Sequence, residues 1–157
     1  MHVGITGHRG LSAEVERQVR QLLDDAVRAY DPTDLVGVSC IADGPDAWFA
    51  EAVLIHGGRL EVVVPAAAYR QGLPEWHRPV YDELMRHAAD IHETGLKDSD
   101  SAAHMAGSES LVGLADELIA VWDGKPAWGY GGTADVVAYA ERNGVPVRVL
   151  WPEGATR

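Results

Sequence analysis

The sequence predicts an α/β fold, a three-layer sandwich with a mostly parallel central sheet and helices on both faces. Short runs rich in β-branched and aliphatic residues alternate with longer segments whose apolar residues recur at three-and-four spacing, which indicates strands alternating with amphipathic helices. The run from Leu35 to Ala42 is almost continuously apolar, as is typical of strands buried on both faces of a parallel sheet. Repetition of this kind implies right-handed crossovers between parallel strands.

The first half of the chain contains three strands and two helices. Ser12 is the predicted N-cap of the first helix, and Val15 and Val19 belong to its apolar stripe. Asp43 is the predicted cap of the second helix, and Pro45 stands in its first turn. In order, the predicted elements are the strand His2–Thr6, the helix after Ser12, the strand Leu35–Ala42, the helix from Pro45 to the HGG turn and the strand Leu60–Pro65.

The second half continues the alternation. A helix is predicted over Pro74–Ala89, where Trp76 and Leu84 align on one face, and a short strand follows over Asp90–His92. Asp100 or Ser101 is expected to cap the next helix, which reaches about residue 115. The remaining elements are the strand Leu118–Trp122, the helix Thr133–Asn143 and the final strand VPVRVLW.

Length and composition indicate one domain, residues 1–157. The chain is 46% hydrophobic and 24% charged, and no apolar run approaches the length of a membrane span. The N-terminus leads directly into a strand-like segment without the features of a signal peptide, so a cytoplasmic location without membrane contact is expected. The single cysteine, Cys40, lies in an apolar run and is interpreted as a buried hydrophobic residue.

The formal net charge of −11 argues against nucleic acid as a partner, because a polyanion gains little counterion release from a surface with few cations. A small phosphate-bearing ligand is compatible with this charge, since one arginine and a few backbone amides suffice to hold a phosphate. The expected partner is therefore a small molecule.

Three loops that follow predicted strands contain glycine: TGHRG (6–10), ADGPD (42–46) and DGKPAWGYGGTAD (123–135). Because the carboxyl ends of parallel strands meet at one edge of a sheet, these loops are expected to form a ligand pocket there. The predicted ligand-binding residues are Thr6, Gly7, Arg9, Asp43, Gly44, Gly131, Gly132, Thr133 and Asp135.

The third loop is the main candidate for phosphate binding. Gly131 and Gly132 would expose backbone amides, Thr133 would add a hydroxyl donor, and the helix start would contribute its partial positive charge. A tight turn without a ligand is the alternative explanation for the glycines. Arg9 is the best cationic candidate, because guanidinium can bind phosphate in a bidentate manner. Asp43 and Asp46 are expected either to contact a ribose or to cap the helix that they precede.

No cofactor and no metal site is predicted. The loop TGHRG matches neither the G-x-G-x-x-G dinucleotide fingerprint nor the P-loop. His87, His92 and Glu93 are close in sequence, but their spacing matches no zinc signature. Trp128 and Tyr130, beside the glycines of the third loop, are candidates for stacking on a base.

These motifs resemble those of the SLOG superfamily of Rossmann-like nucleotide-binding proteins, which includes the LOG-type phosphoribohydrolases and the DNA-processing protein A fold. The similarity covers nearly the whole chain, in GITGHR, ADGPD and, most specifically, ADELIAVWDGKPAWGYGGTADVVAYA. The resemblance implies a domain that binds a nucleotide or a nucleotide-derived molecule, for example as a sensor.

The catalytic part of a LOG site is not matched. LOG enzymes carry a P-G-G-x-G-T-x-x-E loop, and aligning Gly132 and Thr133 with it puts Val136 at the position of the glutamate. The segment SAAHMAGSESLVGLAD also lacks the arginine that the LOG helix supplies. A phosphoribohydrolase that cleaves the N-glycosidic bond of a nucleoside monophosphate is therefore the alternative function, with Asp135 or His8 as acid or base. A non-catalytic interaction module is a third function, and a homodimer paired through a helix face stays open.

Overall fold

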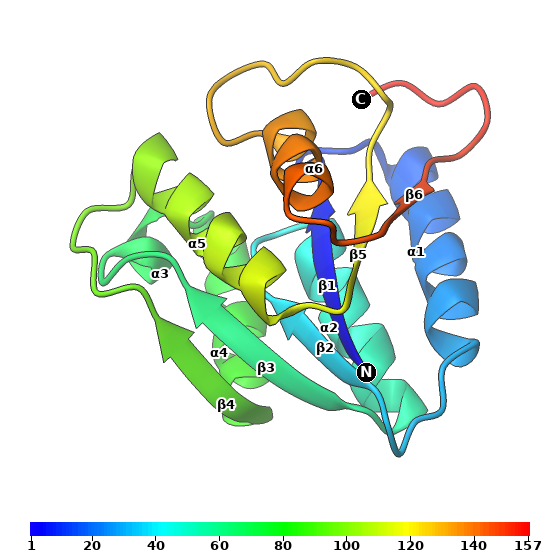
Figure 1. The fold of residues 1–157 in the computed structure, drawn as a ribbon, viewed down its shortest axis with the longest axis horizontal. Helices are drawn as coiled ribbons and strands as arrows, with labels where there is room; N and C mark the ends of the chain where they lie inside the picture. Colours follow the sequence, from blue (N-terminus) through cyan, green and yellow to red (C-terminus); the bar gives the residue numbers. More distant parts are fainter.

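One six-stranded sheet forms the centre of the computed structural model, which describes all 157 residues (Figure 1). Its strands lie in the order β4-β3-β2-β1-β5-β6, and every neighbouring pair is parallel. The strands are β1 (His2–Gly7), β2 (Val36–Ser39), β3 (Arg59–Val64), β4 (Ala88–Glu93), β5 (Glu117–Val121) and β6 (Val147–Leu150). The helices are α1 (Ala13–Arg28), α2 (Pro45–His56), α3 (Tyr69–Gly72), α4 (Arg78–Arg86), α5 (Ser101–Leu114) and α6 (Thr133–Arg142), with a single 3-10 turn, η1 (Glu75–His77).

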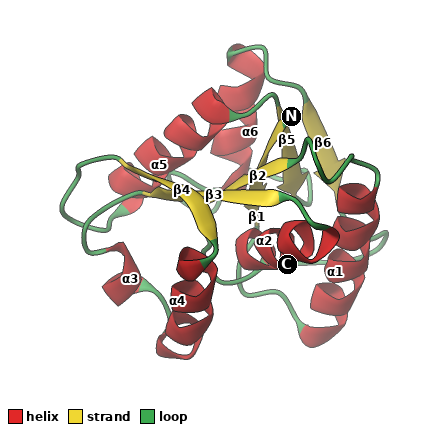
Figure 2. Ribbon diagram, turned by 90° about the horizontal axis from the view of Figure 1, so that it is seen from below, coloured by secondary structure: helices red, strands yellow, loops and turns green.

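Helices cover both faces of the sheet. Figure 2 shows α5 and α6 on one face and α1, α2 and α4 on the other. The predicted three-layer α/β sandwich is confirmed, and its sheet is wholly parallel. None of the helices combines the length and the apolar character that crossing a membrane requires.

Helix α1 illustrates how the apolar pattern becomes packing. The Oγ of Ser12 accepts a hydrogen bond from the N–H of Val15 at 3.3 Å, as predicted for an N-cap. Val15, Val19 and Leu23 are buried in a core cluster that also contains apolar residues of β1 and β5. Cys40 is buried as expected.

The second strand is shorter than predicted. It ends at Ser39, although the apolar run continues to Ala42. Ile41 has a φ of 46°, which is rare for a β-branched residue, and its N–H donates to the Oγ of Ser39 at 2.9 Å. The backbone therefore leaves the strand here in a strained turn that leads into α2.

The helix predicted over Pro74–Ala89 is wrong at both ends. The segment forms η1 and then α4, and β4 already begins at Ala88. Pro79 has no N–H to donate to an earlier carbonyl, so it can occupy only the first turn of a helix, and α4 starts anew around it. Trp76, expected on the apolar face, is 70% exposed, whereas His77 is buried.

The strand order creates a crevice beside β1. The first three strands after β1 extend the sheet in one direction, and α5 then returns the chain so that β5 pairs with the other edge of β1. In open α/β sheets, ligands bind at such a reversal, outside the carboxyl ends of the strands. The ends of β1 and β5, at Gly7 and Val121, lie side by side there.

Candidate functional site

A cavity of about 400 Å³ lies at the carboxyl ends of the strands, where β1 and β5 meet. Its wall includes the loop after β1, the loop after β5, the start of α6 and one side of α5. The predicted residues that line this cavity are Thr6, Gly7, Arg9, Gly131, Gly132 and Thr133, together with His8.

Two predicted residues of the second loop do not line the cavity. Asp43 instead holds Arg9: its Oδ1 accepts from Nε at 2.9 Å and from Nη2 at 2.6 Å. The prediction that Asp43 caps α2 is wrong, because the N-cap is Gly44, whose φ of 96° favours glycine. Asp43 therefore orients the guanidinium of Arg9.

The glycine loop uses two of its own amides internally. The Oδ2 of Asp135 accepts from the N–H of Gly131 at 2.9 Å, and the N–H of Gly132 donates to the carbonyl of Gly129 at 3.2 Å. Asp135 does not line the cavity. Gly131 has a φ of 85°, so the turn itself requires glycine there. The amides expected to meet a phosphate are thus partly satisfied within the loop.

The first turn of α6 keeps its donors free. The N–H groups of Thr133 and Ala134 have no acceptor inside the helix, because the first intrahelical bonds to Gly132 come from Asp135 and Val136. Thr133 is buried against the cavity wall and adds its hydroxyl group. The free backbone donors beside the cavity therefore lie in this turn rather than in the glycines before it.

His8 is buried between Asp123 and Arg157. Its Nε2 lies 3.2 Å from Oδ1 of Asp123, and its Nδ1 lies 3.3 Å from Nη1 of Arg157. Burial is the main cause that lowers the pKa of His8, and the charge of Arg157 adds to it, whereas the hydrogen bond with Asp123 opposes both. The two residues expected as acid or base, His8 and Asp135, are therefore both engaged by other groups.

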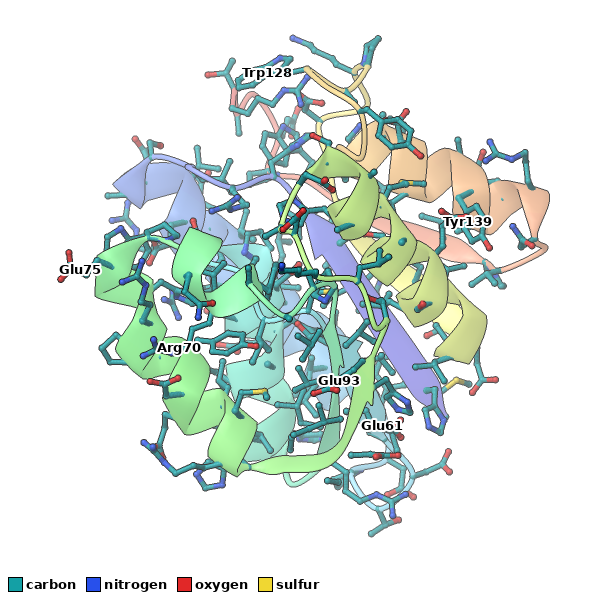
Figure 3. The ribbon with its side chains drawn as sticks, turned by 90° about the vertical axis from the view of Figure 1, so that its left-hand side faces the viewer. Glu61, Arg70, Glu75, Glu93, Trp128 and Tyr139 are labelled. Carbon is teal, nitrogen blue, oxygen red and sulfur yellow. The ribbon has the colours of Figure 1, made fainter.

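Arg157 is a cavity residue that the sequence analysis missed. Its Nε lies 3.0 Å from Oδ2 of Asp123, and its Nη2 donates to the carbonyl of Pro126 at 2.7 Å. Its guanidinium also lies 4.2 Å from the centre of the Trp128 ring (Figure 3 labels Trp128). No motif in the sequence links Arg157 to this loop, so only the fold reveals a second arginine at the site.

Asp46, which was expected either to contact a ribose or to cap the helix, is not the N-cap of α2, because that residue is Gly44. It lies in the first turn of α2 and lines the cavity. Burial raises the pKa of Asp46 to about 7, with a smaller contribution from Asp43, while a backbone hydrogen bond from Ala42 and the charge of Arg9 oppose the rise. The carboxyl group of Asp46 therefore holds its proton more tightly than that of an exposed aspartate.

The chain matches no family model and no curated protein. Solved structures do match. DNA processing protein A from Helicobacter pylori, which binds single-stranded DNA, is 18% identical over 98% of this chain and 66% of that chain, with a TM-score of 0.72. DNA processing protein A from Streptococcus pneumoniae is 18% identical over 98% of this chain and 51% of that chain, with a TM-score of 0.69. The molybdenum cofactor carrier protein from Chlamydomonas reinhardtii is 16% identical over 94% and 74%, with a TM-score of 0.56.

The chain shares the Rossmann-like α/β fold of these proteins. The resemblance inferred from the GITGHR, ADGPD and GGTAD motifs is confirmed at the level of the fold. The chain spans 66% and 51% of the length of the two DNA processing proteins.

The expectation that net charge argues against nucleic acid is wrong for proteins of this fold. A protein with this fold, DNA processing protein A from H. pylori, binds single-stranded DNA. Net charge sums over the whole surface, whereas a binding groove needs cations only where the backbone lies.

Proposed function

We propose that this chain binds a nucleotide or a nucleotide-derived small molecule in the cavity at the carboxyl edge of the sheet. The observation that carries the proposal is the convergence of Arg9, Arg157 and the first turn of α6 on that cavity. Free helix-terminal N–H groups next to arginine side chains are a common way to bind a phosphate.

The phosphate would lie at the start of α6. The N–H groups of Thr133 and Ala134 and the Thr133 hydroxyl supply the donors. Arg9 supplies the opposing charge: Nε and Nη2 are held by Asp43, which leaves Nη1 to reach the ligand. Because Asp43 fixes the guanidinium in advance, little side-chain entropy would be lost on binding.

Size and surface chemistry favour a mononucleotide or a small derivative. A volume of about 400 Å³ lies within the range of small-molecule pockets. Trp128 and Tyr130, which are 82% and 65% exposed, stand among the cavity-lining residues and offer ring faces for a base.

Single-stranded DNA is the second candidate ligand. This ligand is favoured by the structural likeness to DNA processing protein A from H. pylori, which binds single-stranded DNA. That likeness extends over 98% of this chain. A single strand presents the same phosphate and stacking base as a mononucleotide, so both ligands would use Arg9, the start of α6 and the exposed aromatic side chains.

Calorimetric titration with AMP, with ADP-ribose and with an oligothymidylate tests this proposal. The control is Gly132→Val, because a Cβ at this position would lie 2.7 Å from the Cβ of Ala127 and would displace the loop. We expect saturable binding of AMP or ADP-ribose that weakens at least about tenfold in the variant. Circular dichroism establishes that the variant is folded.

The other outcomes separate the alternatives. Binding of the oligothymidylate without binding of AMP or ADP-ribose would support single-stranded DNA as the ligand. Release of free adenine from AMP would indicate the phosphoribohydrolase. Equally weak heats for both proteins with every ligand would contradict the proposal.

A further inference from the structure

A second cluster of polar side chains lies at the other end of the sheet. In Figure 3, Glu61 lies at the opposite end of the molecule from Trp128. His2 of β1, Glu61 of β3 and both Asp90 and His92 of β4 contribute to it. The Nε2 of His2 lies 2.9 Å from Oε2 of Glu61, and the Nε2 of His92 lies 2.7 Å from Oε1.

The sheet register brings the members of this cluster together. Glu61 pairs with Asp90, whereas the preceding Leu60 pairs with Ala88. Ala89 is therefore an extra residue, a β-bulge in the β3–β4 ladder. Without this shift, Glu61 would pair with Ala89. Asp90 and His92 would then lie on the opposite face of the sheet from Glu61.

Two carboxylates share one imidazole nitrogen in this cluster. The Oδ2 of Asp90 lies 3.7 Å from the Nε2 of His92, the same nitrogen that contacts Glu61. A positive charge between the two carboxylates, on a protonated imidazole or on a bound cation, offsets their repulsion. The side chain of Glu61 is only 16% exposed, so solvent screens this repulsion incompletely.

We propose that Glu61, Asp90 and His92 bind a divalent transition-metal cation of the zinc class, while His2 holds the second carboxylate oxygen of Glu61. Imidazole nitrogen and carboxylate oxygen are the ligands that zinc accepts, and three of them leave the fourth tetrahedral position to a water molecule. This site shares no residue with the cavity and does not depend on the function proposed for it.

The distances are compatible with such an ion. One ligand atom each from Glu61, Asp90 and His92 lies within 4.8 Å of the others. Ligand atoms around a tetrahedral zinc ion are about 3.4 Å apart, so small movements of the Asp90 and His92 side chains bring these three residues to that spacing. The ion would replace the imidazole proton that His92 now shares with Glu61, with the Nε2 lone pair directed at the metal.

The position of His2 is independently fixed. Its backbone N–H donates to Oδ2 of Asp116 at 2.8 Å, and its side chain is 37% exposed. The side chain of His92 is 32% exposed. An ion can therefore reach the cluster from solvent, while the strands hold the ligands in place before it binds.

Zinc titration by calorimetry at neutral pH, on protein without a polyhistidine tag, tests the proposal. We expect one ion per chain, with affinity lowered at least about tenfold in His92→Gln and in Glu61→Gln. Cobalt provides a second readout, because a tetrahedral site with nitrogen ligands gives intense visible absorption that His92→Gln should remove. If either variant fails to fold, Asp90→Asn replaces it, because that side chain is 64% exposed.

The matched control is His87→Gln. This histidine also pairs with a glutamate, Glu83, at 3.1 Å, but on the exposed surface of α4 and without further ligands. Its loss should leave zinc binding unchanged. Absence of saturable binding, or equal affinity in wild type and His92→Gln, which would mean an adventitious ion only, would overturn the proposal. Nucleotide binding by His92→Gln is measured as well, because this variant should lose zinc binding and keep nucleotide binding. Failure of the zinc proposal can thus be told apart from failure of the function proposed for the cavity.

Discussion

The two ends of the sheet differ in how they gather polar groups. At the carboxyl end, loops and the start of α6 assemble donors and two arginines around a cavity. At the other end, side chains of His2, Glu61 and His92 project from the strands themselves. The proposed anion site draws on backbone N–H groups of a loop and a helix start, whereas the proposed cation site draws only on side chains of strands. The comparison teaches that one sheet can present opposite electrostatic character at its two ends.

The largest expected effect is loss of the anion site through Arg9→Gln. A hydrogen bond to a charged group contributes about 1.5–3 kcal/mol, so nucleotide affinity should fall about tenfold to a hundredfold in calorimetry. Zinc affinity should not change, because Arg9 takes no part in the cluster at the other end. Arg28→Gln is the control, since Arg28 also pairs with an aspartate, Asp25, but on the exposed surface of α1. Equal nucleotide affinity in both variants would remove Arg9 from the site.

Asp46→Asn should produce an intermediate effect that depends on pH. The folded-state pKa of Asp46 is about 7, above its unfolded value of about 3.9, so the folded protein binds an extra proton between these values. Stability is therefore lost as pH rises through this window, and the asparagine variant should be more stable than wild type by about 1–2 kcal/mol at about pH 8.

Urea denaturation of wild type and Asp46→Asn at about pH 5 and about pH 8 measures this effect. Asp24→Asn, an exposed aspartate on α1, is the control and should show no such pH dependence. If the difference in the free energy of unfolding between wild type and Asp46→Asn is the same at both pH values, the pKa of Asp46 is not raised by folding.

The smallest expected effect is the change in stability caused by Glu61→Gln, in the cluster at the other end of the sheet. Burial alone would raise the pKa of Glu61, but hydrogen bonds from His92 and His2 outweigh it and lower the pKa. The stabilisation is present above the unfolded pKa and is lost as pH falls through the folded value. Without zinc, Glu61→Gln should cost about 0.5 kcal/mol at neutral pH and nothing in strong acid, measured by urea denaturation. A cost that persists in acid would mean that Glu61 acts through packing.

The carboxyl end could largely be predicted, because a loop's place in a parallel sheet follows from the strand before it. Arg9 and Thr133 are far apart in sequence, yet both follow strands whose ends meet. The hydrogen bond between the Asp135 side chain and the Gly131 backbone could also have been predicted from the sequence. An acidic residue three positions after an N-cap commonly bonds back to the backbone before the helix, as Asp135 does with Gly131.

Other features depend on tertiary structure that no local pattern specifies. Arg157 reaches Asp123 only because the segment after β6 folds back over the sheet end. The cluster around Glu61 depends on one extra residue, Ala89, in the β3–β4 ladder. Spacing along the chain suggested His87, His92 and Glu93 as the metal candidates to consider, whereas strand pairing brings His92 together with Glu61 and Asp90 instead.

The strand order has a consequence for synthesis of the protein. β1 lies in the middle of the sheet, and one of its two neighbours, β5, begins only at Glu117. On the ribosome, β1 can pair with β2 early, but its other edge stays open until most of the chain has emerged. Late pairing of strands that are distant in sequence slows folding and leaves an intermediate whose open strand edge promotes aggregation. Growth at reduced temperature or with extra chaperones should therefore raise the yield of folded protein.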